Sequence, residues 1–242
     1  MSHAVIEAVN WSAIPNPTSH VCDDPERVAH ALRLLTASTT ANQTGDAASL
    51  LAGGGFICRH AAMVFPAAYA ATPILLDLVE HGQRPRIKDA ALGLLSDALG
   101  CFPSAGFNRV DTRYGSDVPL CCAMARHIRG RHGTLLAHGR NGKSLLADAA
   151  LHWRLTIEET EPRAGADGTL TAIAVLEGAP FETPVEAEVH TLPFVGPGPT
   201  VRIDDFTSDA AGTACIQLRQ PPPGSLTTGS TLYPADCGRS EH

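Results

Sequence analysis

Through the first two thirds of the chain, apolar side chains recur every three or four residues, which is the period of a helix with one buried face. The clearest stripe follows Asp24 and Pro25, an acidic residue before a proline that is typical of a helix start. Its apolar members are Val28, Ala31, Leu32 and Leu35. A second stripe comprises Ile87, Ala90, Ala91, Leu94, Leu95 and Leu99. These patterns predict amphipathic helices that pack against one another.

The predicted helices are about ten to fifteen residues long, and their pairs lie roughly forty residues apart, which is the spacing of an α-solenoid. Between two such pairs, the run FICRHAAMVF predicts a short helix that ends near Phe65. Alanine-rich faces would let neighbouring pairs approach closely. The sequence therefore predicts a mainly α protein, with a helical repeat domain over residues 11–160.

Residues 161–242 follow a different pattern. The segments TLTAIAVLE, PVEAEVHTL, TVRIDDF and TACIQLR are short, β-branched and partly alternating, as strands are. Ten of the eighteen prolines lie from Pro162 onward. Residues 1–154 carry 14 basic and 12 acidic side chains, whereas residues 155–242 carry 4 and 13. We expect an acidic, Pro-rich extension with short strands, either a small β-appendage or a tail that packs on the helices.

The sequence favours a cytoplasmic protein with no membrane partner. Its amino terminus, MSHAVIEAVNWS, lacks a basic stretch followed by an apolar one. The longest uncharged apolar run, Ala61–Leu76, is too short to span a bilayer and contains two prolines. The seven cysteines are irregularly spaced and odd in number, which favours reduced thiols.

Three parts of the helical region carry a resemblance to a known family. They are Trp11, the stretch from His60 through FPAAYAATPILLDLVEHG, and the stretch CAMARHIRGRHGTLLAHGRNGKSLLADAALHW. A His-containing turn before an A-x-x-A-T-x-P-x-L-like helix resembles a unit of the HEAT-repeat-like, armadillo-type helical repeat proteins common in actinobacteria. The resemblance covers roughly residues 11–155 and implies an α-solenoid that binds other macromolecules, although analogy of fold does not choose a function.

The leading functional hypothesis is a non-catalytic binding or scaffold module that recognises a protein or peptide partner. The alternative is an enzyme or ligand-binding protein whose inner helical face has a pocket for an anionic small molecule. An arginine-rich segment and the His-containing turn would supply that pocket. Its candidate ligand-binding residues are His60, Tyr69, Arg126, His127, Arg129 and Arg131. The net charge of −7 argues against a nucleic-acid partner.

The spacing of cysteine and histidine gives little support to a metal site. The candidates are Cys58, His60, Cys121, Cys122, His127 and His132. Adjacent residues on a helix point about 100° apart, and neither Cys121 nor Cys122 lies three or four residues from His127. The sequence has neither C-x-x-C nor H-E-x-x-H. We therefore expect no metal and no cofactor, with these cysteines as small core residues and no catalytic residue assigned.

The stretch AHGRNGKS at residues 137–144 matches the loose phosphate-loop pattern. A nucleotide site needs a buried strand before the loop, and the preceding TLLAH is too short and too polar at its end for one. A turn between two helices explains the same residues. Gly139 would end the first helix, and Asn141 and Gly142 would make the turn. Ser144 or Asn141 would cap the second helix.

The turn interpretation predicts that replacing Lys143 leaves nucleotide binding unchanged, because no binding is expected. Isothermal titration with ATP and magnesium should give no binding heat for the protein or for Lys143→Ala. A measurable affinity that is lost in the variant would contradict this interpretation.

Overall fold

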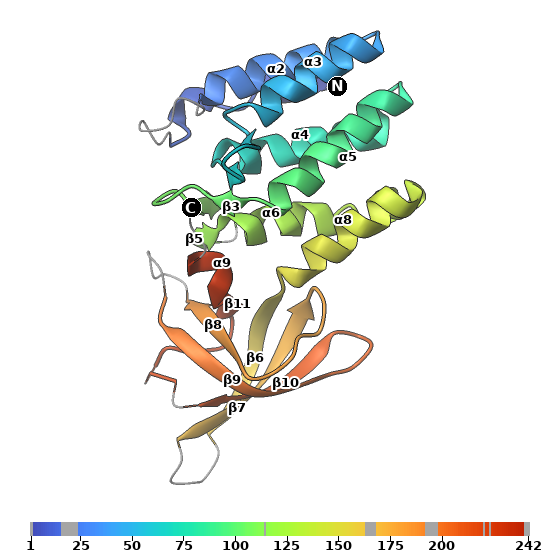
Figure 1. Ribbon diagram of the computed structural model, residues 1–242. Helices are drawn as coiled ribbons and strands as arrows, with labels where there is room; N and C mark the ends of the chain where they lie inside the picture. Colours follow the sequence, from blue (N-terminus) through green and yellow to red (C-terminus); the bar gives the residue numbers. More distant parts are fainter. Residues whose placement is uncertain are drawn as a thin grey trace. The chain divides into compact units, whose positions relative to one another are not determined.

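The computed structural model describes residues 2–15, 24–113, 115–162, 168–191, 198–219, 221–222 and 224–239. These residues form two compact units (Figure 1). Unit 1 takes its described residues from Met1–Asn108 and Ala123–Asp148, and unit 2 from Arg109–Cys122 and Ala149–Arg239. Of the described residues, 45% are helical and 28% lie in strands, so the prediction of a mainly α fold is wrong.

Unit 1 consists mostly of helices. Those that lie wholly or partly in it are α1 (Ser2–Glu7), η1 (Trp11–Ala13), α2 (Pro25–Ala37), α3 (Ala41–Ala52), α4 (Ala67–His81), α5 (Pro85–Leu99), α6 (Leu120–Arg129), α7 (His132–Ala137) and α8 (Gly139–Leu151). Helix α2 packs against α3, and α4 against α5, as hairpins (Figure 1). Helix α2 begins where predicted, because the Asp24 side chain accepts hydrogen bonds from the backbone N–H groups of Glu26 and Arg27. No helix among the described residues has both the length and the apolar composition needed to cross a membrane.

A small sheet interrupts the succession of helical hairpins. Its strands are β1 (Ile57–Cys58), β2 (Met63–Val64) and β3 (Phe102–Pro103). Strand β2 pairs antiparallel with β1 and parallel with β3. The helix predicted to end near Phe65 is therefore wrong, because a buried apolar run of this length fits strands as well as a helix. The predicted HEAT-like α-solenoid is wrong as well, since sheet and barrel strands replace the uninterrupted helical repeat.

Unit 2 contains a closed barrel of antiparallel strands (Figure 1). Its strands are β6 (Arg154–Pro162), β7 (Thr169–Glu177), β8 (Val185–His190), β9 (Thr200–Ser208), β10 (Thr213–Arg219) and β11 (Thr231–Pro234). Their order around the barrel is β10-β7-β6-β11-β8-β9. Strands β8, β9 and β10 are consecutive neighbours, and β11 returns to lie beside β8. This connection is a Greek key.

The barrel encloses its own hydrophobic core. Successive side chains of a strand point to opposite faces, so every second residue can face inward. The buried residues of this core include Leu155, Ile157, Ala172, Ala174, Ala187, Val189, Val201, Ile203, Ala214, Ile216, Leu218 and Leu232. The alanines suit the narrow interior of a small barrel. Trp153, directly before β6, stacks on Phe181 with ring centroids 4.2 Å apart.

The barrel corrects the prediction of a Pro-rich, partly β extension. The segments predicted as strands are confirmed as β7, β8, β9 and β10, but the sequence pattern does not predict β6 or β11. Strand β6 continues a segment that begins as helix α8, and β11 has only four residues. Four residues that end in Pro234 show too little alternation to indicate a strand.

The inward position of Ile216 can be tested by truncation. Ile216 is fully buried, so Ile216→Ala should lower the free energy of unfolding by about 2–5 kcal/mol through lost burial and a residual cavity. Urea denaturation followed by Trp153 fluorescence measures this, in a Trp11→Phe background that leaves one of the two tryptophans. The control is Val175→Ala, whose side chain is 38% exposed and which should cost less than about 1 kcal/mol. Equal losses would show that Ile216 does not face the core.

Candidate metal centre

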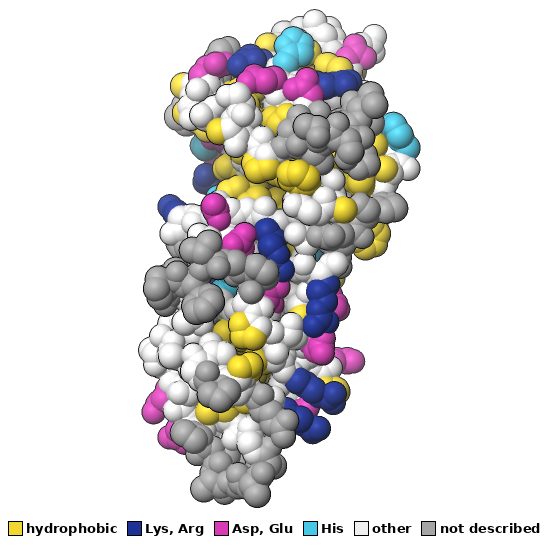
Figure 2. Space-filling view, turned by 90° about the vertical axis from the view of Figure 1, so that its left-hand side faces the viewer, with side chains coloured by type: hydrophobic (Ala, Val, Ile, Leu, Met, Phe, Trp, Pro, Cys, Tyr) yellow, Lys and Arg dark blue, Asp and Glu magenta, His cyan; other side chains and the backbone are white. Residues whose placement is uncertain are grey.

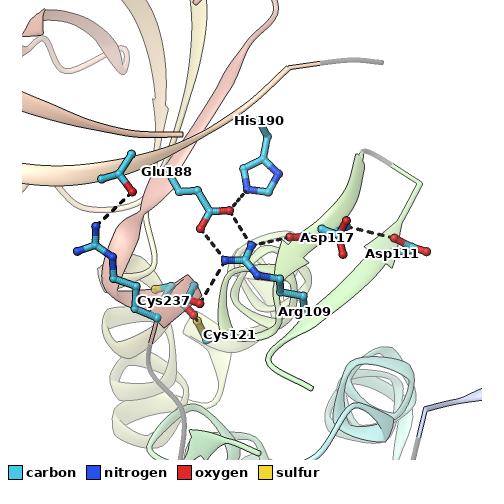
Figure 3. Close-up of polar contacts among 10 residues, drawn as sticks. Arg109, Asp111, Asp117, Cys121, Glu188, His190 and Cys237 are labelled. Atoms are coloured by element: carbon cyan, nitrogen blue, oxygen red, sulfur yellow. Dashed lines mark hydrogen bonds and ion pairs between the residues drawn. The ribbon is translucent and has the colours of Figure 1, made fainter. Parts of the chain in front are cut away.

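Four side chains of unit 2 bring potential metal ligands together. They are Cys121, Cys122, His152 and Cys237, and their ligand atoms all lie within 4.8 Å of one another. His152 Nδ1 is 3.2 Å from Cys237 Sγ, and Cys121 Sγ is 3.9 Å from the backbone oxygen of Cys237. Figure 3 shows Cys121 and Cys237 close together, next to Arg109. We call these four residues the cysteine–histidine cluster.

Three separate segments of the chain deliver the cluster. Strands β4 (Arg109–Thr112) and β5 (Gly115–Pro119) form an antiparallel hairpin, and β5 runs directly into the first turn of α6, where Cys121 and Cys122 lie. His152 follows the end of α8, and Cys237 lies in α9 (Ala235–Arg239), directly after β11. Cys237 is 85 residues from His152 and 116 residues from Cys121. The cluster therefore depends on the tertiary fold rather than on a local motif.

The loop after β7 holds the backbone on both sides of His152. Gly178 has φ +122°, a conformation that favours glycine. A Cβ at this position would lie 2.8 Å from the oxygen of Ala150 and 2.9 Å from Cα of Trp153. The backbone N–H of Ala179 donates to the same Ala150 oxygen at 2.8 Å. This close packing positions the turn that carries His152.

The dimensions of the cluster suit a single tetrahedral ion. Zinc–sulfur bonds of about 2.3 Å place tetrahedral ligand atoms roughly 3.8 Å apart. All ligand atoms of the cluster lie within 4.8 Å of one another, so modest side-chain rotation can bring them to this spacing. Three thiols and one imidazole are a donor set found in structural zinc sites.

The three thiols influence one another because they are buried and share hydrogen bonds. Cys121 accepts hydrogen bonds from the thiols of Cys122 and Cys237, of which the bond from Cys122 has the larger effect. These bonds hold the pKa of Cys121 well below its usual value. Burial holds the pKa of Cys122 well above its usual value. The hydrogen bond to Cys121 also raises the pKa of Cys237, to about 11. The thiols by themselves thus favour one thiolate among neutral neighbours, and further negative charge would need a cation beside it.

A buried ion pair lies beside the cluster (Figure 3). Arg109 Nη1 and Nη2 donate to the two carboxylate oxygens of Glu188 at 2.6 and 2.7 Å. Arg109 also donates to the backbone oxygens of Asp117 at 3.0 Å and of Gly238 at 3.2 Å. His190 Nε2 lies 2.7 Å from Glu188 Oε1. Only 6% of the Glu188 side chain is exposed, so this pair links β4, β8 and α9 away from water.

The ligand-binding residues predicted from the sequence lie in unit 1, and the structure brings only some of them together. The rings of Tyr69 and His127 have centroids 5.2 Å apart. His60 is exposed in the turn between β1 and β2, and Arg131 pairs with Glu80 at 2.8 Å. Figure 2 shows Lys and Arg side chains beside Asp and Glu side chains on one face of the molecule. Anion binding by the predicted residues stays a prediction.

The stretch AHGRNGKS joins two helices. Helix α7 precedes it where a phosphate loop requires a strand. Gly139 has φ +63°, as a helix-ending residue should, but α8 already begins there. The predicted turn at Asn141 and Gly142 is therefore wrong, and Lys143 lies within α8. Gly142 instead permits close approach to α7, because a Cβ there would overlap the backbone oxygen of Leu135.

In the sequence, Cys121 and Cys122 are metal-ligand candidates, but their neighbours in the cluster are not. The sequence groups the two cysteines with His127 and His132, whereas the structure places them beside His152 and Cys237. Spacing rules for metal sites detect ligands that share a helix or a short loop. His152 and Cys237 meet only because β11 closes the barrel, so no local spacing marks them.

Comparison of the chain with protein-family models, with curated proteins and with solved structures gives no match. The resemblance to HEAT-repeat-like and armadillo-type proteins therefore has no support and is wrong, in sequence as in fold. The function of the chain has to be argued from its own geometry.

The Glu188 ion pair makes stability depend on pH. Burial raises the pKa of Glu188, but hydrogen bonds from His190 and Arg109 and the guanidinium charge outweigh it and lower the pKa from 4.5 to about 2. Because the pKa of Glu188 is lower in the folded protein than in the unfolded chain, the ionised carboxylate stabilises the fold by about 3 kcal/mol at pH values above 4.5. This stabilisation is lost as the pH falls from 4.5 towards 2. Glu188→Gln should therefore be less stable than the parent at pH 7, with a difference that shrinks over this window.

Urea denaturation in the presence of a chelator, at a series of pH values, measures the difference. Glu186→Gln is the matched control, because Glu186 lies on the same strand and forms an exposed ion pair with Arg239. That variant should lose less than about 1 kcal/mol. A Glu188→Gln deficit that is constant from pH 7 to pH 2 would count against the shifted pKa.

Proposed function

We propose that the protein binds zinc, with the cysteine–histidine cluster holding one structural Zn²⁺ ion in unit 2. The proposal is carried by one observation: three cysteines and a histidine from distant segments place their ligand atoms within 4.8 Å of one another. Four protein ligands complete a tetrahedron and leave no position for water or substrate, which is the pattern of a structural rather than a catalytic site. The ion would join the first turn of α6, the turn after α8, and α9.

Such an ion would stabilise unit 2 by binding its folded state selectively. It would join segments 85 and 116 residues apart, and these ligands come together only when the chain is folded. A ligand present at 1,000 times its dissociation constant stabilises the folded state by about 4 kcal/mol.

The contact between His152 and Cys237 favours a second candidate, a cysteine nucleophile with a histidine base. A nucleophilic cysteine needs a thiolate that a substrate can reach. Cys237 is only 9% exposed, and its pKa is raised to about 11. A nucleophilic Cys237 would also give no role to the sulfur atoms of Cys121 and Cys122. Zinc binding explains both the burial and the number of thiols.

A structural zinc centre is compatible with the non-catalytic class of function expected from the sequence, because four protein ligands leave no open coordination position. We retain a binding or scaffold module for a protein or peptide as the broader proposal, now without the concave solenoid surface. The enzyme alternative would need a reactive site other than the four-coordinate centre.

The zinc proposal predicts about one zinc ion per chain when the full-length protein is purified without chelator and analysed by inductively coupled plasma mass spectrometry. Cobalt substitution should give the visible absorption of tetrahedral, thiolate-bound Co²⁺. In a Trp11→Phe background, removal of the ion should lower the melting temperature followed by Trp153 fluorescence by roughly 15 °C, since each 1 kcal/mol shifts a domain of about 100 residues by about 4 °C.

Cys122→Ser and Cys215→Ser make a matched pair for this test. Cys122 belongs to the cluster, so the Cys122→Ser variant should lose most of the zinc. Cys215 lies in β10 outside the cluster, so the Cys215→Ser variant should keep it. The proposal is overturned if the parent protein takes up no zinc after reconstitution, or if both variants lose it equally. Selective alkylation of Cys237 at neutral pH in a zinc-free protein would favour the nucleophile instead.

A further inference from the structure

Cys237 reaches the cluster from a helix that is not stable alone. Helix α9 has five residues, far fewer than an isolated helix needs in water. It packs on β5 and β8. Contacts outside the helix must therefore hold its backbone in place if Cys237 is to meet Cys121 and Cys122.

The Arg109–Glu188 pair supplies such contacts on both sides of the cluster. One guanidinium donates to the backbone oxygen of Asp117, on the strand that leads into Cys121, and to that of Gly238, the residue after Cys237. Glu188 holds the guanidinium through both of its oxygens. The planar fork of arginine suits this pattern, because it can bind a carboxylate with two donors and still reach further acceptors.

Gly238 shows how closely the helix backbone lies against this pair. A Cβ at this position would lie 2.5 Å from Arg109 Nη2 and would clash with Glu188 Oε2. Any side chain at 238 would therefore displace either the ion pair or the backbone that carries Cys237. The constraint at this position is the close approach of the ion pair and not a left-handed backbone, since Gly238 has no positive φ.

We infer that Arg109 and Glu188 are positioning residues of the metal centre, which hold the Cys237–Gly238 backbone in its binding position before the ion arrives. The inference rests on the proposed zinc site. Groups that orient metal ligands from outside the coordination sphere typically contribute 10–100-fold to metal affinity. The ion pair would raise the zinc affinity because it already holds the Cys237–Gly238 backbone in place, so that less conformational entropy is lost when zinc binds.

The inference predicts weaker zinc binding in Arg109→Lys and in Gly238→Ala. Lysine keeps the positive charge but cannot bridge Glu188, Asp117 and Gly238, and the alanine methyl group clashes with the pair. Competition with a chromophoric chelator should give a dissociation constant raised about 10–100-fold in each variant. The Co²⁺ spectrum at saturating metal should also change, because Cys237 meets the ion in a different orientation.

Matched controls separate positioning from general damage to the barrel. Arg219→Lys alters an exposed ion pair between Arg219 on β10 and Asp204 on β9, and Gly115→Ala adds a methyl group with only ordinary contacts. Both controls should keep the parent affinity and spectrum. Measurements are made at a temperature where far-ultraviolet circular dichroism and Trp153 fluorescence show every variant folded.

Hydrogen exchange of the metal-free parent protein gives a test that needs no variant. The peptide containing α9 should remain partly protected after chelation, since the ion pair holds it without metal. Complete loss of protection in that peptide would overturn the inference, as would parent affinity in both Arg109→Lys and Gly238→Ala. If the parent protein binds no zinc, the proposed function itself fails, and α9 protection then reports on the ion pair alone.

Discussion

Unit 2 depends on one constraint, the pairing of β11 with β6 on one side and with β8 on the other. This four-residue strand closes the barrel, so that β6 and β8 have no open edge for another chain to pair with. It also buries Leu232 in the barrel core. Because α9 follows β11 without a linker, closure brings Cys237 to His152 and Gly238 to Glu188. The cluster and the ion pair are both consequences of how the barrel closes.

A buried ion pair at this place needs a physical reason, because an apolar pair of similar volume is often as stable. The reason lies in the backbone. The part-buried backbone oxygens of Asp117 and Gly238 accept hydrogen bonds from Arg109. An apolar side chain at position 109 would leave both without this donor, and an unsatisfied buried carbonyl costs about 1–3 kcal/mol. Glu188 then offsets the charge that Arg109 brings.

Local rules in the sequence predict local structure, and they fail where distant segments meet. Asp24 and Pro25 mark the start of α2 correctly, because a helix cap involves neighbouring residues only. The alternation of apolar and polar residues predicts β7 to β10, because this pattern also involves only residues that are close together in the sequence. Periodicity cannot show that the helical hairpins stop short of a solenoid, nor that Thr231 pairs with Thr156 across the barrel. Cys121 and Cys122 stand out by type, but their neighbours His152 and Cys237 become visible only once the barrel is closed.

The proposed zinc centre and the Arg109–Glu188 pair would both cross-link unit 2, and they differ in what they require. The Arg109–Glu188 pair needs no ion, whereas the thiols carry more than one negative charge only beside a cation. Small zinc fingers are unfolded without metal because they lack a core of their own. Unit 2 has such a core in the barrel, and the ion pair already holds α9 against β8. We therefore expect that loss of the proposed zinc ion would free the ligand side chains and lower stability without unfolding the barrel, so that folding would precede metal binding.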